Sequence, residues 1–99
     1  MKTELTTEQS KHLIGLGAPD EKASLCGYRK NPIFKLADLL EILPKKIDGK
    51  NRIIESDVKG HFAYYCGAIE IIGWRHAEEE LIDALYQLAC WYYGEYLKK

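Results

Sequence analysis

The sequence lacks any apolar run close to the roughly 20 residues that a membrane-spanning helix needs, and Met1-Lys2-Thr3-Glu4 leads into no apolar stretch typical of a secretion signal. Cysteine is scarce as well: Cys26, Cys66 and Cys90 are widely spaced and contain no C-x-x-C pair. An odd number of scattered cysteines without a secretion signal predicts free thiols in a reducing compartment. We therefore expect a cytoplasmic protein with no disulfide bonds.

A strong net charge is also absent. The formal net charge is −1, with 29% charged and 46% hydrophobic residues. This balance argues against disorder and against a general electrostatic preference for nucleic acid or membranes. The 99 residues predict a single domain, residues 1–99, that can bury a core without disulfides or metal. Residues 1–5 are expected to form a loose N-terminal tail.

Recognisable catalytic motifs are missing too. The sequence has no dinucleotide-binding, P-loop, nucleophile-elbow or zinc-protease signature. The best metal-ligand candidates are His61, Cys66 and His76. His61 and Cys66 are separated by an odd number of positions on one predicted strand, which places their side chains on opposite faces. No family signature surrounds Cys66 or Cys90, the candidates for cysteine–histidine catalysis. We therefore predict no metal, no cofactor and no enzymatic activity.

The most informative feature that is present is a long amphipathic segment, predicted to be one helix over residues 77–97. Its apolar residues fall on one arc of the helical wheel and polar residues fall opposite. The arc consists of Leu81, Leu85, Leu88, Ala89, Tyr92 and Tyr96, with Ile82 and Tyr93 at its edge. Glutamates at positions 78–80 would form the first turn, where negative charge favours the helix dipole.

Trp91 is the residue of this helix that is hardest to place. It lies about 90–120° from the centre of the apolar arc, beside Ala84 and Gln87. One interpretation is that a short N-terminal helix covers Trp91. The other is a contact with a second copy or another protein, because tryptophan and tyrosine are enriched in interfaces. That second interpretation predicts a partner contact made by Ala84, Gln87, Trp91 and Lys98.

The N-terminal half predicts three short helices. Thr6-x-x-Gln9 is a capping box that begins the first helix, and Gly17 ends it. Pro19 and the acids after it begin a second helix, which is predicted to reach residue 25 or 26 and to be followed by a loop. The third covers residues 36–43, where leucines share one face and a proline follows.

The middle of the chain predicts a small sheet. Residues 45–51 would be a polar connection around Asp48-Gly49, followed by a strand over residues 52–56. A hairpin loop over residues 57–60 leads to a strand over residues 61–66, and residues 68–72 form a third strand or continue the second. The sequence therefore predicts an α+β fold, in which short N-terminal helices and a long C-terminal helix accompany an antiparallel β-hairpin or three-stranded sheet. The long helix is expected to pack on that sheet.

The segment from residue 45 to residue 59 is slightly basic, with five basic and three acidic residues, or about +2 by count. Proteins that bind single strands of nucleic acid combine basic grooves with exposed aromatic residues, and Phe62, Tyr64 and Tyr65 follow this segment. The alternative function is therefore a small nucleic-acid-binding regulator. Its predicted contacts are Lys45, Lys46, Lys50, Arg52 and Lys59.

Three segments occur together in this order: Thr7-Glu8-Gln9-Ser10-x-x-Leu13-x-x-x-Gly17, Pro32-x-Phe34-x-Leu36-x-Asp38-Leu39-Leu40-x-x-Leu43-Pro44-Lys45, and Leu81-Ile82-Asp83-Ala84-Leu85. With them the chain resembles a family of small uncharacterised proteins encoded in prophage and mobile-element regions of gut anaerobes. The resemblance implies no activity, cofactor or catalytic residue, and it favours an accessory protein over a metabolic enzyme. The leading prediction is a non-enzymatic protein-interaction module.

Overall fold

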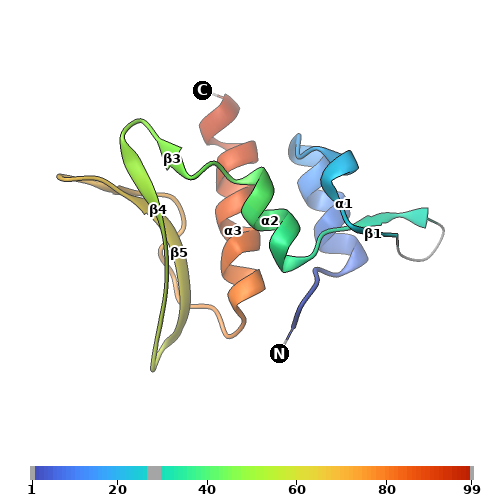
Figure 1. Cartoon of the computed structure of the whole chain (residues 1–99), viewed down its shortest axis with the longest axis horizontal. Coiled ribbons are helices and arrows are strands. Elements are labelled where there is room, and N and C mark those ends of the chain that lie inside the picture. The colour runs from blue at the N-terminus through green and yellow to red at the C-terminus, as the bar shows by residue number, and fades with distance from the viewer. Residues whose placement is uncertain (1, 27–29, 99) are drawn as a thin grey trace.

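The structure is a computed structural model that describes residues 2–26 and 30–98 (Figure 1). The elements, in chain order, are α1 (Thr7–Leu16), the 3-10 helix η1 (Asp20–Lys22), β1 (Leu25–Cys26), β2 (Pro32–Ile33), α2 (Leu36–Ile42), β3 (Lys46–Ile47), β4 (Lys50–Asp57), β5 (Gly60–Cys66), β6 (Ile71–Ile72), α3 (Leu81–Gly94) and the 3-10 helix η3 (Tyr96–Lys98). The predicted α+β fold is confirmed.

Helix α3 lies at the centre of the molecule, between two layers (Figure 1). The antiparallel sheet β3-β4-β5-β6 lies on one side, and α1 and α2 lie on the other. The predicted packing of this helix on the sheet is confirmed, and Leu85 and Leu88 are fully buried. Because helices cover the side away from the sheet, burial extends beyond the predicted arc. Ala84, one of the predicted partner-contact residues, is fully buried.

Helix α3 begins at Leu81 and not at residue 77. The amide of Glu78 donates to the carbonyl of His61 at 3.0 Å, and the amide of His61 donates to the carbonyl of Glu78 at 2.8 Å. These bonds hold residue 78 against β5, so residues 78–80 precede the helix instead of forming its first turn. Gly60, at φ +136°, allows this approach, because a Cβ there would lie 2.5 Å from the Glu78 carbonyl oxygen.

The predicted capping box of α1 is confirmed, because the Thr6 hydroxyl accepts from the Gln9 amide and the Gln9 side chain accepts from the Thr6 amide, both at 3.0 Å. The prediction of a loose tail is wrong for residues 2–5. Leu5 is only 2% exposed and its amide donates to the carbonyl of Phe34 at 2.9 Å. The amide of Leu36 donates to the carbonyl of Thr3. Residues 2–5 therefore belong to the packed fold.

The second predicted helix is reduced to the three residues of η1. Residues 25–26 instead form β1, which pairs antiparallel with β2, so part of the predicted loop is a strand. Residues 27–29 lie outside the described part of the chain. The cause of this departure is Ser24, whose amide and hydroxyl both donate to the Asp38 carboxylate on α2. That anchor draws the chain out of the helical conformation.

Two tight turns give the sheet its register. Asp48 and Gly49 both have positive φ, 49° and 78°, as in the type I′ turn that joins antiparallel strands. The predicted turn is confirmed, although its flanks are the strands β3 and β4 and not a connection. The predicted hairpin loop is also confirmed, with Asp57 paired to Gly60. The segment 68–72, predicted as a third strand or a continuation of the second, forms only the short strand β6 at Ile71–Ile72, and β3 at the other edge gives the sheet four strands instead of two or three.

Asp38 predicts a pH dependence of stability. Burial by itself raises the pKa of its carboxyl, but hydrogen bonds from Ser24 and from the Lys35 amide lower it, and the resulting pKa is below the ordinary value. Stabilisation by a carboxylate with a lowered pKa is complete above its unfolded-state pKa and is lost as the pH falls through its folded-state pKa.

We therefore expect Asp38→Asn to lower the free energy of unfolding by about 1–3 kcal/mol at pH 7. The difference in the free energy of unfolding between the variant and wild type should become smaller as the pH is lowered below about 4. Urea titrations between pH 7 and pH 3 measure both effects. Asp20→Asn on exposed η1 is the matched control and should change little. A deficit that is the same at every pH would contradict the assigned role of the carboxylate.

Candidate functional site

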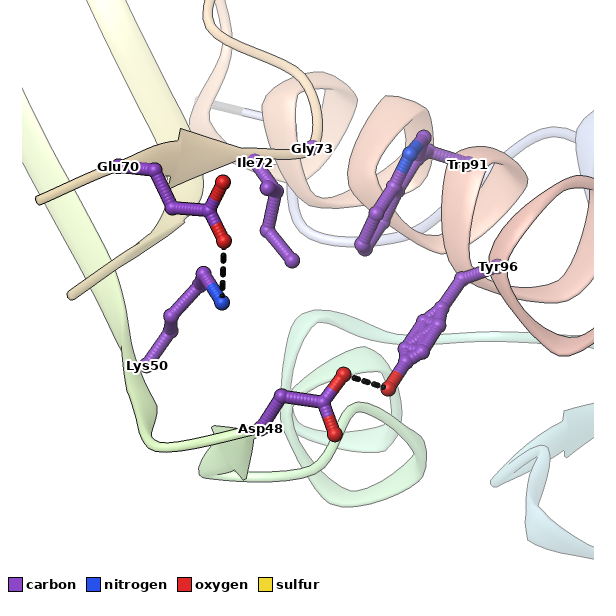
Figure 2. A pocket seen from close by; sticks show the side chains of 7 residues that line it. All are labelled: Asp48, Lys50, Glu70, Ile72, Gly73, Trp91 and Tyr96. Carbon is purple, nitrogen blue, oxygen red and sulfur yellow. Dashed lines mark hydrogen bonds and ion pairs between the residues drawn. The ribbon is translucent and has the colours of Figure 1, made fainter.

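A cleft of about 590 Å³ opens where the C-terminal end of α3 meets one end of the sheet (Figure 2). Its lining residues are Asp48, Lys50, Glu70, Ile72, Gly73, Trp91 and Tyr96. They come from the β3–β4 turn, the start of β4, the segment around β6, α3 and η3. The volume falls in the range of about 300–1,000 Å³ that is typical of ligand pockets. We refer to this cavity as the Trp91 cleft.

Aromatic and apolar groups form one wall of the Trp91 cleft. Figure 2 shows the ring of Trp91 extending into the cleft between Ile72 and Tyr96. The ring centroid of Trp91 is 5.5 Å from that of Tyr96 and 6.2 Å from that of Tyr65 on β5. Trp91 therefore has aromatic neighbours from the sheet, Tyr65, and from η3, Tyr96. Neither belongs to a short N-terminal helix, which is the element that one interpretation of the sequence places over Trp91.

Gly73 brings the end of β6 close to α3. It has φ +98°, and a Cβ at this position would lie 2.7 Å from a methyl group of Leu88 and 3.6 Å from the Trp91 ring. A side chain here would collide with the packed face of the helix, and the positive φ is strained for residues other than glycine. Gly73 thus determines how closely the strand and the Trp91 ring approach each other.

Two polar pairs form the rim of the Trp91 cleft. Lys50 Nζ lies 2.7 Å from Glu70 Oε1, and the Tyr96 hydroxyl donates to Asp48 Oδ2 at 2.6 Å (Figure 2). The hydrogen bond to Asp48 raises the pKa of the Tyr96 hydroxyl. Lys50 is only 13% exposed, so its position is well constrained. The cleft therefore offers aromatic surface beside carboxylates and an ammonium group.

The four predicted partner residues lie in different environments in the structure. Gln87 and Trp91 are half-buried and together line a second hollow of about 320 Å³ beside Trp74 and Cys90. Lys98 is exposed on η3. Ala84 cannot contribute, because it has no exposed surface. Sequence reasoning missed Asp48 and Glu70 as cleft residues, because Asp48 carried only a turn signal and Glu70 fell within the segment predicted as a third strand or a continuation of the second.

The five basic residues of the nucleic-acid alternative do not form one patch. Nη1 of Arg52 donates to the carbonyls of Leu40 and Leu43, each at 2.8 Å, and so caps the C-terminal end of α2. Lys50 is paired with Glu70. Lys45, Lys46 and Lys59 are exposed, but Lys59 lies in the turn at the far end of β4, roughly 25 Å from the β3 end.

The candidate cysteines and histidines have separate environments. His61 Nδ1 lies 2.5 Å from the Ser56 hydroxyl, whereas His76 contacts the ring of Trp74. In the described part of the chain, no three histidine, cysteine or acidic residues form a group that could hold a metal ion. Cys66 and Cys90 are unbridged, half-buried thiols. Burial raises the pKa of Cys90, which disfavours the reactive thiolate.

Across residues 2–26 and 30–98, no helix combines the length and apolar character required to cross a bilayer. A scan of protein-family models, a search of curated proteins and a search of solved structures each found no match to this chain.

Proposed function

We propose that this protein is a non-enzymatic protein-interaction module and that the Trp91 cleft is the centre of its contact surface. The observation that carries the proposal is the half-buried Trp91 ring, which extends into an open cleft beside Tyr96. Interface residues that contribute most to affinity are typically tryptophan, tyrosine and arginine inside a polar rim. Asp48, Lys50 and Glu70 supply such a rim.

The exposed apolar side chain of Ile69 extends this surface beyond the cleft. Ile69 is 98% exposed, at the tip of the connection between β5 and β6. It lines a hollow of about 230 Å³ that shares Asp48, Lys50 and Glu70 with the Trp91 cleft. A stable interface buries about 800 Å² on each partner, so a surface that includes Ile69 accommodates a protein better than the cleft alone.

The partner in this proposal is a protein, either a second copy of this chain or a different molecule. An accessory role agrees with the resemblance to proteins of prophage and mobile-element regions. The alternative, a nucleic-acid-binding regulator, receives less support. Arg52 and Lys50 already contact groups within the fold, and the remaining three lysines are divided between the two ends of β4.

The proposal predicts that Trp91→Ala weakens association by more than about fivefold. Because this change also removes packing, Ile69→Ser provides a second test at a residue that contributes almost nothing to the core. Val58→Ser is the matched control, since Val58 is equally exposed but lies in the β4–β5 turn at the other end of the hairpin.

Sedimentation equilibrium detects self-association, and pull-down from the native cell with mass spectrometry detects other partners. We expect the Ile69→Ser protein to lose association that wild type and Val58→Ser retain. If the Trp91 and Ile69 variants associate as tightly as wild type, the Trp91 cleft is not the contact surface. A wild-type protein that remains monomeric and captures no partner would refute the proposed function itself.

A further inference from the structure

One side of the sheet ends in an unpaired strand edge. Strand β3 pairs only with the beginning of β4, through Lys46 with Asn51 and Ile47 with Lys50. The last bond on this side is from the Arg52 amide to the Lys45 carbonyl, at 2.9 Å. Beyond it, β4 continues from residue 53 to residue 57 with no strand beside its outer edge in the described part of the chain. We call this stretch the β4 edge.

The hairpin register shows which backbone groups this edge presents. Asp57 and Gly60 close a two-residue turn, so Asp57, Glu55 and Ile53 direct their amides and carbonyls to β5. Ile54 and Ser56 direct theirs outward. The outward bond of Arg52 follows the same alternation and supports this assignment. The β4 edge therefore offers the amide and carbonyl groups of two residues to a neighbouring strand.

The opposite edge of the β4–β5 hairpin, which is the outer edge of β5, is covered. Tyr65 on β5 pairs with Ile72 on β6, and His61 is bonded to Glu78. Figure 1 shows the helices α1, α2 and α3 all on one side of the β4–β5 hairpin. Residues 54–57 are exposed, and Ile54 is 39% exposed even though it is a large apolar residue. An exposed strand edge of this kind is a template for another strand.

Acidic side chains border the β4 edge. Glu55 and Asp57 share one face with Ile53, while Ile54 and Ser56 share the other. The Glu55 carboxylate accepts from the Tyr64 hydroxyl at 3.0 Å, and the Asp57 carboxylate accepts from the Lys59 amide at 2.7 Å. The ion pairs found among the described residues involve neither carboxylate. Both negative charges are thus available to a neighbouring strand.

We propose that the β4 edge binds an extended peptide as an additional antiparallel strand, with basic side chains opposite Glu55 and Asp57 and apolar side chains opposite Ile54. In strand addition, main-chain hydrogen bonds give affinity and alternate side chains give specificity. Opposite charges that face each other across two strands stabilise the pair. This surface is separate from the Trp91 cleft, which includes only the beginning of β4.

A second copy of the chain fits this edge less well than a basic peptide. Two-fold pairing through Ile54 and Ser56 places Glu55 opposite Glu55, and a shift toward the turn places Glu55 opposite Asp57. Like charges in these positions destabilise a strand pair. A shift away from the turn would pair Ser56 of one copy with Arg52 of the other. That pairing needs the Arg52 amide as a donor, but this amide already donates to the carbonyl of Lys45.

The test uses a fluorescent peptide, acetyl-Lys-Val-Lys-Val-Lys-Val-Lys-amide, and anisotropy titration of the full-length protein. In the antiparallel arrangement the valine amides face β4 and the lysine amides face solvent. N-methylation of the valine amides should therefore weaken binding at least tenfold, whereas N-methylation of the lysine amides should change it less than about twofold. Equal behaviour of the two methylated peptides, or the reverse order, would overturn the proposal.

Two further measurements test the location and the charge. The amides of Ile54 and Ser56 should become protected from hydrogen exchange when the peptide binds. Glu55→Lys should weaken binding at least about threefold, while Glu21→Lys, the same change on exposed η1, should leave it unchanged. Protection of Ile54 and Ser56 that grows with protein concentration and without peptide would instead identify a second copy as the occupant and overturn the proposal. Ile69→Ser should not affect peptide binding. Failure of the proposal for the Trp91 cleft is therefore distinguishable from failure of the proposal for the β4 edge.

Discussion

Replacing Leu85 with alanine should lower the free energy of unfolding by about 2–5 kcal/mol. Leu85 is fully buried in the second turn of α3, which has the sheet on one side and α1 and α2 on the other. A cavity at this position is enclosed by both layers. The surroundings can relax only partly into such a space, so the lost contacts add to the lost transfer free energy.

Urea denaturation followed by circular dichroism measures this change. The control is Leu97→Ala, the same substitution on η3, where the side chain is mostly exposed. That variant should lie within about 0.5 kcal/mol of wild type. Similar small effects for both variants would show that α3 is not the centre of the core.

Arg52→Met should lower the free energy of unfolding by about 1.5–3 kcal/mol. The guanidinium of Arg52 donates to the carbonyls of Leu40 and Leu43 at the end of α2, where helical carbonyls have no partner within the helix. Methionine retains an apolar stem but leaves both carbonyls without this donor. A cation at this end also interacts favourably with the helix dipole.

Thermal and urea unfolding of Arg52→Met should be compared with Lys46→Met, which removes a charge from an exposed site on β3. We expect Lys46→Met to have little effect. The nucleic-acid alternative makes the opposite prediction for Arg52, namely unchanged stability and weaker retention on single-stranded DNA or RNA. These two measurements therefore separate a structural arginine from a phosphate-binding one.

The two proposed surfaces are related through a single strand. Lys50, at the start of β4, lies in the rim of the Trp91 cleft, and the β4 edge occupies the other end of the strand. Strand β4 pairs with β5 from Asn51 to Asp57, between the two surfaces. The two surfaces use different residues, so variants at Ile69 and Glu55 test them independently.

The elements that the sequence by itself determined are those that depend on close neighbours. The capping box of Thr6 and Gln9, the helix Leu36–Ile42 and the turn at Asp48-Gly49 all need only residues within a few positions of one another. Side-chain caps, helical periodicity and backbone preferences at a turn act over that range. The burial of Leu85 was also predictable, because it follows from the apolar period of α3.

Only the tertiary structure decided the features that depend on residues far apart in the chain. Helix α3 begins late because Glu78 is hydrogen-bonded to His61, and Ser24 leaves the helical conformation because it is bonded to Asp38. Ala84 is buried because a second layer covers α3. The Trp91 cleft likewise combines separate turns, a strand and a helix end. Such contacts depend on how the elements pack, and local periodicity contains no information about which distant group will supply a bond or cover a face.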